Sequence, residues 1–323
     1  MKTMKWLLRR EFWEHKGSMY IAPVVVASLM LATMVGSLIF GKTVRVFNME
    51  VNGQHVAING LPPEMQAKLA QIATSGYLFV SAPLFLMLAV VVFWYCLGAL
   101  YDERRDRSIL FWKSLPVSDE MSVLSKVLTA AVVSPAITGA VAIVLSLVFL
   151  FAACTVLTFH GVNLFSQVIA SPNLYLAPLA LFSLLPVYIV WALPTIGWLM
   201  LVSSWARSKV FLWAVGAPIV ALLIVRWVSF LIYGIQLDGG PLFQVVREIV
   251  VHGLAGVMPG IWFKYHVISP EALMLPEHAG LNVPVLISQS WASLASAEAW
   301  IGVAAGVAML YAAVRIRRWR DEG

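Results

Sequence analysis

The sequence predicts an all-α integral membrane protein with six transmembrane helices, an N-terminal amphipathic interfacial helix and an extracytoplasmic segment before the last span. Of its 323 residues, 61% are hydrophobic and only 12% are charged, whereas a soluble domain carries roughly 25% charged residues. Several apolar runs also reach the roughly 20 residues that a helix needs to cross a hydrocarbon core. These runs are too long, and too uniformly apolar, for the strands of a membrane β-barrel.

Residues 1–17 are expected to form an interfacial helix that leads into the first span. In such a helix Met1, Met4, Leu8 and Phe12 would share one flank. The segment also contains two glutamates, which argues against a cleaved signal peptide. A frayed tail is the alternative interpretation.

The apolar runs place the six spans at about 19–40, 77–100, 127–159, 179–202, 210–233 and 291–314. We treat 1–323 as a single transmembrane domain.

Charge predicts the orientation of these spans. Sixteen of the 22 Lys and Arg residues fall in four stretches: 2–16, 104–126, 207–209 and 315–320. Since basic residues favour the cytoplasmic side, both termini are expected there. The formal net charge of +6 is then a topology signal, and no nucleic-acid partner is expected.

Two extracytoplasmic segments, 41–76 and 235–290, follow from this topology. The first contains a hairpin candidate with turn signals at Asn52-Gly53 and Asn59-Gly60, and then a short helix over 62–74. In the second, apolar residues at helical spacing within 241–262 suggest a re-entrant or an interfacial helix, and the sequence does not decide between them.

The polar stretch 101–125, YDERRDRSILFWKSLPVSDEMSVLS, separates the second and third spans. It mixes charge with aromatic and apolar residues, which suggests a docking surface for a soluble partner. Ser118 or Asp119 is expected to cap a helix that begins there. The residues expected to contact the partner are Glu103, Arg104, Arg107, Phe111, Trp112, Leu115, Pro116, Val117, Ser118 and Asp119. A solvated loop that only fixes topology is the alternative.

This layout resembles the permease subunit of a type-2 ABC exporter. The resemblance rests on six spans, an amphipathic N-terminal helix and the stretches Asp102–Arg104, Arg107–Leu110 and Ser114–Ser118 between spans two and three. It implies that 101–125 is a coupling loop, docked on a separate ABC ATPase. It also implies a second permease subunit, either a copy of this chain or a paralogue, in a bacterial inner membrane.

No phosphate-binding loop of the form G-x-x-x-x-G-K-[ST] occurs, so ATP and Mg²⁺ are expected on the partner ATPase and no cofactor on this chain. Neither a nucleophile elbow nor an H-E-x-x-H helix is present, so an enzyme is not expected. His252, His266 and His278 have no metal-ligand spacing, and no metal is expected.

Arg226 is the one charge placed deep in a span, and such charges usually face protein or water. We expect it to pair with Glu298 near the outer end of span six, to meet an anionic substrate, or to snorkel to the interface. Gly302 and Gly306 would allow close helix approach. Prolines in the spans are candidates for hinges or for static kinks.

The function expected is transport of an amphipathic substrate, such as a peptide, a drug or a lipid-like molecule, out of the cell. A secondary transporter and a membrane anchor or assembly subunit are the alternatives. The substrate itself is not specified by the sequence.

Overall fold

The computed structural model describes residues 2–40, 50–51, 54–55, 62–108, 117–159, 161–234, 239–265 and 282–319. Six helical stretches in it are long and apolar enough to cross a membrane, which confirms the predicted class and the predicted number of spans. They are Gly17–Ser37, Glu64–Arg105, Asp119–Phe159, Pro172–Trp205, Leu212–Ile232 and Ala297–Trp319.

Helices account for most of the described chain. The elements of the first part are α1 (Lys2–Glu14), η1 (Gly17–Ile21), α2 (Ala22–Phe40), β1 (Glu50–Val51), β2 (Gln54–His55), α4 (Pro63–Gly76), η3 (Tyr77–Ser81), α5 (Ala82–Gly98) and α6 (Tyr101–Arg105). Those of the second part are α8 (Asp119–Leu128), η4 (Thr129–Val133), α9 (Ser134–Phe159), α10 (Phe165–Ala170), α11 (Pro172–Ser183), α12 (Leu185–Trp205), η5 (Leu212–Gly216), α13 (Ala217–Tyr233), α14 (Gly240–Ala255), η6 (Ile261–Lys264), α15 (Val283–Ala292), η9 (Ser293–Ala295) and α16 (Ala297–Trp319).

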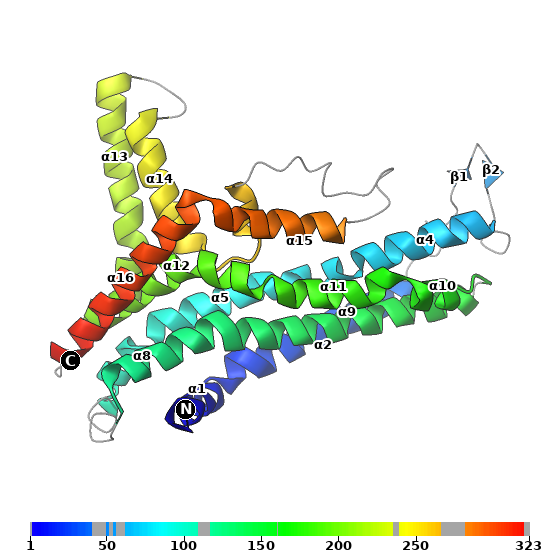
Figure 1. Ribbon diagram of the computed structural model, residues 1–323, viewed down its shortest axis with the longest axis horizontal. Coiled ribbons are helices and arrows are strands. Elements are labelled where there is room, and N and C mark those ends of the chain that lie inside the picture. Colours follow the sequence, from blue (N-terminus) through cyan, green and yellow to red (C-terminus); the bar gives the residue numbers. More distant parts are fainter. Residues whose placement is uncertain are drawn as a thin grey trace.

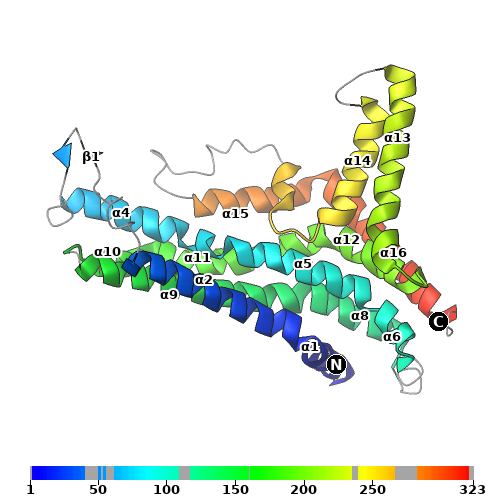
Figure 2. The same cartoon turned by 180° about the vertical axis from the view of Figure 1, so that it is seen from behind.

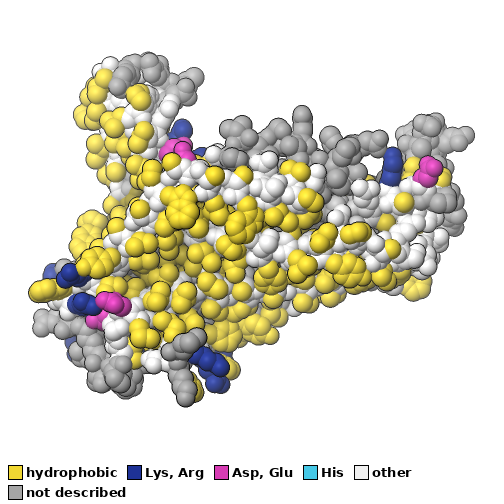
Figure 3. Space-filling model, in the orientation of Figure 1, with side chains coloured by type: hydrophobic (Ala, Val, Ile, Leu, Met, Phe, Trp, Pro, Cys, Tyr) yellow, Lys and Arg dark blue, Asp and Glu magenta, His cyan; other side chains and the backbone are white. Residues whose placement is uncertain are grey.

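Four long helical stretches lie side by side along the molecule, formed by α2, α4–α5, α8–α9 and α11–α12 (Figure 1). The pair α13 and α14 projects from this bundle near one end, as the opposite view also shows (Figure 2). Helix α16 crosses α12, and both termini lie toward the end where α8 begins. The face of the bundle seen in Figure 3 is largely apolar, as expected of helices that face lipid.

The stretches 64–105 and 119–159 contain 42 and 41 residues. At about 1.5 Å per residue each is about 60 Å long, roughly twice the thickness of a hydrocarbon core of about 30 Å. At the end far from the termini a second small core, with Tyr77, Leu150 and Val168 among its residues, joins α4, α9, α10 and α11. The long helices therefore support a packed extension as well as membrane spans.

In the described residues three π-helical turns interrupt the helices, and each ends two residues before a proline. In η4 the Ser134 amide donates to the carbonyl of Thr129, five residues earlier, and Pro135 follows. The same order recurs at Ala22–Pro23 after η1 and at Ala217–Pro218 after η5. Because proline lacks an amide proton and its ring crowds the carbonyl four residues before it, a local widening to the π form relieves the clash.

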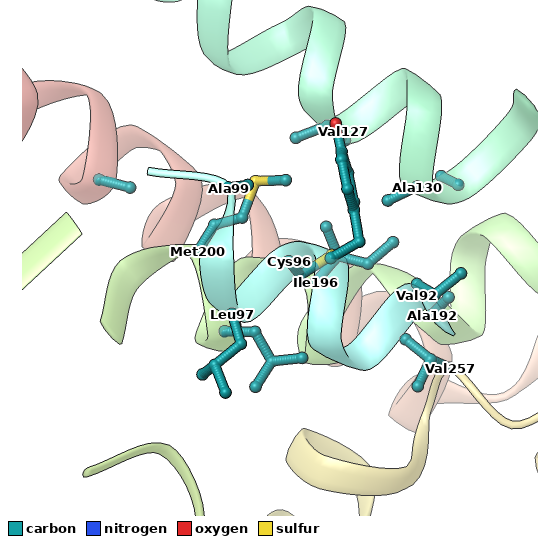
Figure 4. Packing of buried hydrophobic residues seen from close by; sticks show 14 of the residues in the cluster. Val92, Cys96, Leu97, Ala99, Val127, Ala130, Ala192, Ile196, Met200 and Val257 are labelled. Atoms are coloured by element: carbon teal, nitrogen blue, oxygen red, sulfur yellow. The ribbon is translucent and has the colours of Figure 1, made fainter. Parts of the chain in front are cut away.

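Helix α12 is the centre of the main core. Its buried side chains, Trp191, Ile196, Leu199 and Met200 among them, belong to a core in which α12 contacts α5, η4 and α16. Figure 4 shows α5 and α12 in contact, with Cys96 beside Ile196.

Helices α12 and α16 approach closely at two glycines. A Cβ at Gly197 would lie 2.6 Å from the carbonyl oxygen of Gly306. The Gly302 and Gly306 motif thus forms an intramolecular contact with α12, a role that the sequence alone did not assign.

The segments between spans partly follow the predictions. Strands β1 and β2 pair antiparallel with Val51 opposite Gln54, on either side of Asn52-Gly53, which lies outside the described residues. The Asn59-Gly60 turn lies outside the described residues. Helix α4 is present where a short helix was expected, and α14 is the helix expected within 241–262 and folds back beside α13.

The predicted start of span six at Trp291 is wrong. Helix α15 ends at Ala292, and Ser296 has an extended backbone with φ −73° and ψ 143°. The Ser296 hydroxyl accepts a hydrogen bond from the Ala299 amide at 3.4 Å, so it caps a new helix, α16. The apolar run that begins at Trp291 therefore contains a helix break at Ser296, which average hydropathy does not reveal.

Candidate functional site: a buried charge network

Six charged side chains from four helices meet at the end of the bundle that holds both termini. We call this set the charge network; it consists of Arg10 and Glu11 of α1, Glu103 of α6, Asp119 and Lys126 of α8, and Arg317 of α16. Three acidic groups face three basic groups, so the network is neutral overall when all six are ionised.

Glu103 is the centre of the charge network. One of its oxygens, Oε2, accepts from Nη1 of Arg317 at 2.6 Å. The other, Oε1, lies 3.0 Å from Nζ of Lys126 and 3.1 Å from Nη2 of Arg10. A single carboxylate, 7% exposed, thus joins α6 to α1, α8 and α16.

Glu11 is the second buried carboxylate. Nζ of Lys126 donates to its two oxygens at 3.0 and 3.2 Å. The Tyr95 hydroxyl of α5 donates to Oε2 at 2.9 Å, and Nη2 of Arg10 lies 3.0 Å from Oε1. Helix α1 is therefore fastened to α8 and α5 through one side chain.

Asp119 completes the network, since its Oδ1 accepts from Nε of Arg317 at 3.0 Å. Buried charges are stable only when they are paired and hydrogen-bonded, and removing one partner of such a pair typically costs about 3–5 kcal/mol. If one of the four helices moved so that these ion pairs broke, the protein would lose a comparable amount of stability. The network therefore couples the positions of the four helices.

The residues at the start of α8 fix where that helix begins and so which of its side chains face α1 and α16. Ser118 is its N-cap and accepts from the Met121 amide at 3.2 Å, as the sequence predicted. Asp119 and Glu120 occupy the first turn, where negative charge is favourable. Lys126 follows Asp119 by two helical turns, so both lie on the face that meets α1 and α16.

Arg104 was expected to contact a partner, but its side chain is buried against α12. Its Nη2 donates to the carbonyls of Ser203 at 2.6 Å and Ala206 at 2.9 Å, at the C-terminal end of that helix. The Ser203 hydroxyl in turn accepts from the amides of Leu100 and Tyr101. Glu103 is buried in the same way, so these two predicted docking residues make intramolecular contacts.

The remaining predicted docking residues surround the undescribed part of the loop. Arg107 is exposed in a left-handed conformation with φ 57°, Ser118 is exposed and Val117 is half-buried. Phe111, Trp112, Leu115 and Pro116 lie outside the described residues.

A polar cavity of about 370 Å³ adjoins the charge network between α1, α8 and α16. Val117, Ser118 and Asp119 line it from the loop, and Arg317 and Arg318 line it from α16. The end of the loop, the charge network and the C-terminal helix thus form one continuous region.

Sequence reasoning treated Glu11, Lys126 and Arg317 only as helix or topology charges. Nothing local distinguishes them, because their partners on other helices lie 23 to 214 positions away. A weak signal was present, since Lys126 stands at the boundary between the polar stretch and a long apolar run.

The expected ion pair between Arg226 and Glu298 is not among the ion pairs of the described residues. The Arg226 guanidinium lies over the ring of Phe243 in α14, 5.3 Å from its centroid, and so links α13 to α14. Glu298 is exposed in the first turn of α16. Within the described ranges no three His, Cys, Asp or Glu side chains gather as a metal site.

Fold and site together define a multi-pass helical membrane protein with a buried charge network at one end. Comparisons with protein-family models, with curated proteins and with solved structures found no match.

Proposed function

We propose that this chain is the membrane-spanning permease subunit of an ATP-driven exporter of the type-2 ABC class. A separate ATPase, which would hold ATP and Mg²⁺, docks on residues 101–125, and a second permease subunit completes the pathway. In this proposal both termini are cytoplasmic, the membrane is the bacterial inner membrane, and the substrate is amphipathic.

The observation that supports this proposal best is the position of Glu103. It stands six residues before the undescribed part of the loop, at Ile109, and it contacts α1, α8 and α16 through three ion pairs. A force applied to the loop by a docked ATPase would reach three other helices through one carboxylate. Helix α8 continues through η4 and α9 as a rod of 41 residues, which would carry the movement across the membrane.

The π-helical turn η4 lies within this rod, between the charge network and the apolar part of α9. Such turns frequently mark functional positions because their hydrogen bonds rearrange at little cost. In a transporter it would allow α8 to tilt with the loop while α9 adjusts in the bilayer.

The test is affinity purification of the tagged chain with an ATPase assay on the product. The variant combines Leu115→Asp with Pro116→Asp in the loop, and the control is Gln71→Asp, on the exposed face of α4 at the opposite end. We expect a P-loop ATPase to co-purify with the wild type and the control but not with the loop variant. A correctly inserted chain that brings down no ATPase would contradict the proposal and favour a secondary transporter or an assembly subunit.

A further inference from the structure

An apolar cavity of about 470 Å³ lies within the bundle, and it shares no lining residue with the polar cavity beside the charge network. Helices η3 and α5, α9 and the junction of α11 with α12 form its sides. The segment 258–263 and helix α15 close it. Its volume falls in the range of about 300–1,000 Å³ that is typical of ligand sites.

The lining of this cavity is almost entirely hydrocarbon, with Phe85, Leu181 and Trp262 among its larger side chains. Among the residues that line it, Ser75 and Tyr188 carry hydroxyl groups. That of Ser75 donates to the Ile72 carbonyl of its own helix at 3.1 Å. The walls therefore offer hydrocarbon contact with very few polar groups.

Tyr188 is the exception. It is 4% exposed, and its hydroxyl has no hydrogen-bond partner among the described residues. A buried hydroxyl without a partner costs about 1–3 kcal/mol. A ligand with one hydrogen-bonding oxygen beside a long apolar body would recover that energy.

The cavity opens on the side of the bundle that carries apolar side chains. Phe79, Leu86, Phe182 and Met258 line it and are also exposed. Water is a poor occupant, because a bound water needs two to four polar partners. The apolar molecule that a bilayer presents at such an opening is a lipid acyl chain.

We propose that this cavity binds one acyl chain of a lipid, with the Tyr188 hydroxyl donating a hydrogen bond to an ester or carboxylate oxygen of that lipid. This goes beyond the proposed function, because binding requires neither an ATPase nor a second subunit. The lipid is either a resident phospholipid or the lipid-like part of a transported substrate, and both present the same chemistry to the site.

The experiment uses the full chain reconstituted in phosphatidylethanolamine and phosphatidylglycerol vesicles, with a phospholipid that carries a photoreactive diazirine in its acyl chain. After illumination, labelled residues are identified by mass spectrometry. We expect labels on the cavity walls formed by η3, α11 and α12. Ala136→Phe, which fills the cavity from α9, should remove them, whereas Val144→Phe, on an exposed position of the same helix, should not.

Tyr188→Phe tests the hydrogen bond without filling space. Loss of one such bond, worth about 0.5–1.5 kcal/mol, should weaken retention of the labelled lipid by about 2–10-fold. It should also leave the lipid-free protein as stable as the wild type or more stable, because the unpartnered hydroxyl is gone. Labels spread evenly over the lipid-facing surface, and unchanged in Ala136→Phe and Tyr188→Phe, would overturn the proposal.

The two sources of lipid are separated by adding the co-purified ATPase and ATP. A label that stays in the cavity during hydrolysis identifies a resident phospholipid, and one that is lost identifies a transported molecule. Both results support the site. If no ATPase associates with the chain, the labelling result still stands by itself, so failure of the proposed function is distinguishable from failure of this inference.

Discussion

Glu103 and Arg317 are separated by 214 positions in the chain, yet Oε2 of one lies 2.6 Å from Nη1 of the other in a buried ion pair. This contact joins α6, at the start of the 101–125 loop, to α16. Lys126 and Arg10 share the same carboxylate, so Glu103 serves as the common partner of three cations from three helices.

Replacing Arg317 by Met should destabilise the protein by about 3–5 kcal/mol, because Glu103 and Asp119 would each lose a buried cation. Arg318→Met is the matched control, since Arg318 pairs with Glu120 at the surface and exposed pairs contribute about 0–1 kcal/mol. Thermal unfolding of the purified protein in detergent, followed by tryptophan fluorescence, measures both. Equal losses in the two variants would contradict the buried role of Arg317.

Coupling within the charge network predicts that its substitutions are not additive. Glu103→Gln with Arg317→Gln should cost less than the sum of the single changes by about 0.5–3 kcal/mol. The double variant removes both charges, whereas each single variant leaves an unpaired charge in the protein. A strictly additive double-mutant cycle would show that the two side chains do not act together.

The π-helical turn η4 contains one residue more than a regular helix over the same distance. Deleting Val132 together with Pro135→Ala should therefore restore an α-helix and keep α8 and α9 in register. Deleting Leu147 in α9 should instead rotate all that follows by about 100° and expose buried side chains. Size-exclusion profiles and melting temperatures of the two deletion variants measure the difference. An equal loss of stability in both variants would contradict the assignment of η4 as a π-helical turn with one extra residue.

The close approach of α12 and α16 predicts a penalty for a single methyl group. Gly306→Ala would place a Cβ 2.8 Å from the Leu193 carbonyl oxygen, and such overpacking costs about 1–3 kcal/mol. Gly36→Ala in α2 meets no atom within 4 Å and should change stability by no more than about 1 kcal/mol. Melting temperatures of both variants in the same detergent provide the comparison.

His252 predicts a loss of stability in acid. Burial, between Trp191 and Tyr265 at centroid distances of 5.0 and 5.4 Å, lowers its pKa below the ordinary value. Lys264 also lowers the pKa, and Glu248 opposes this. In acid the His252 side chain binds a proton more readily in the unfolded chain than in the folded chain. The free energy of unfolding therefore falls as the pH drops below about 6.5.

His252→Gln carries no titratable group and should flatten this dependence between about pH 7 and pH 5. The measurement is the melting temperature of the wild type and the variant across that range. Parallel curves would assign the acid sensitivity to other groups.

The features that were predictable from the sequence are those set by residues close together in the chain. Hydropathy over 20 residues identifies the spans, Ser118 before Asp119 and Glu120 identifies the start of α8, and Asn52-Gly53 identifies a hairpin. The start of α16 was missed because Ser296 interrupts the run without changing its average hydropathy.

The charge network was not predictable in the same way. Charged residues near the ends of spans are explained by their role in topology. Nothing in the sequence indicated that the same residues also form buried ion pairs. Which carboxylate meets which cation depends on how four helices pack, and the pairs between helices are separated by 23 to 214 positions. Arg104 shows the same difficulty, since its acceptors at the end of α12 lie about a hundred positions ahead.

The charge network also bears on how the chain is made. Synthesis produces Glu11 and Glu103 early, Lys126 follows, and Arg317 is added almost last. Until α16 is in place, Glu103 lacks its shortest ion pair and Asp119 lacks its buried partner. Helix α16 therefore completes the charge balance of the carboxylates that α1, α6 and α8 contribute, and it does so only after those three helices have been made.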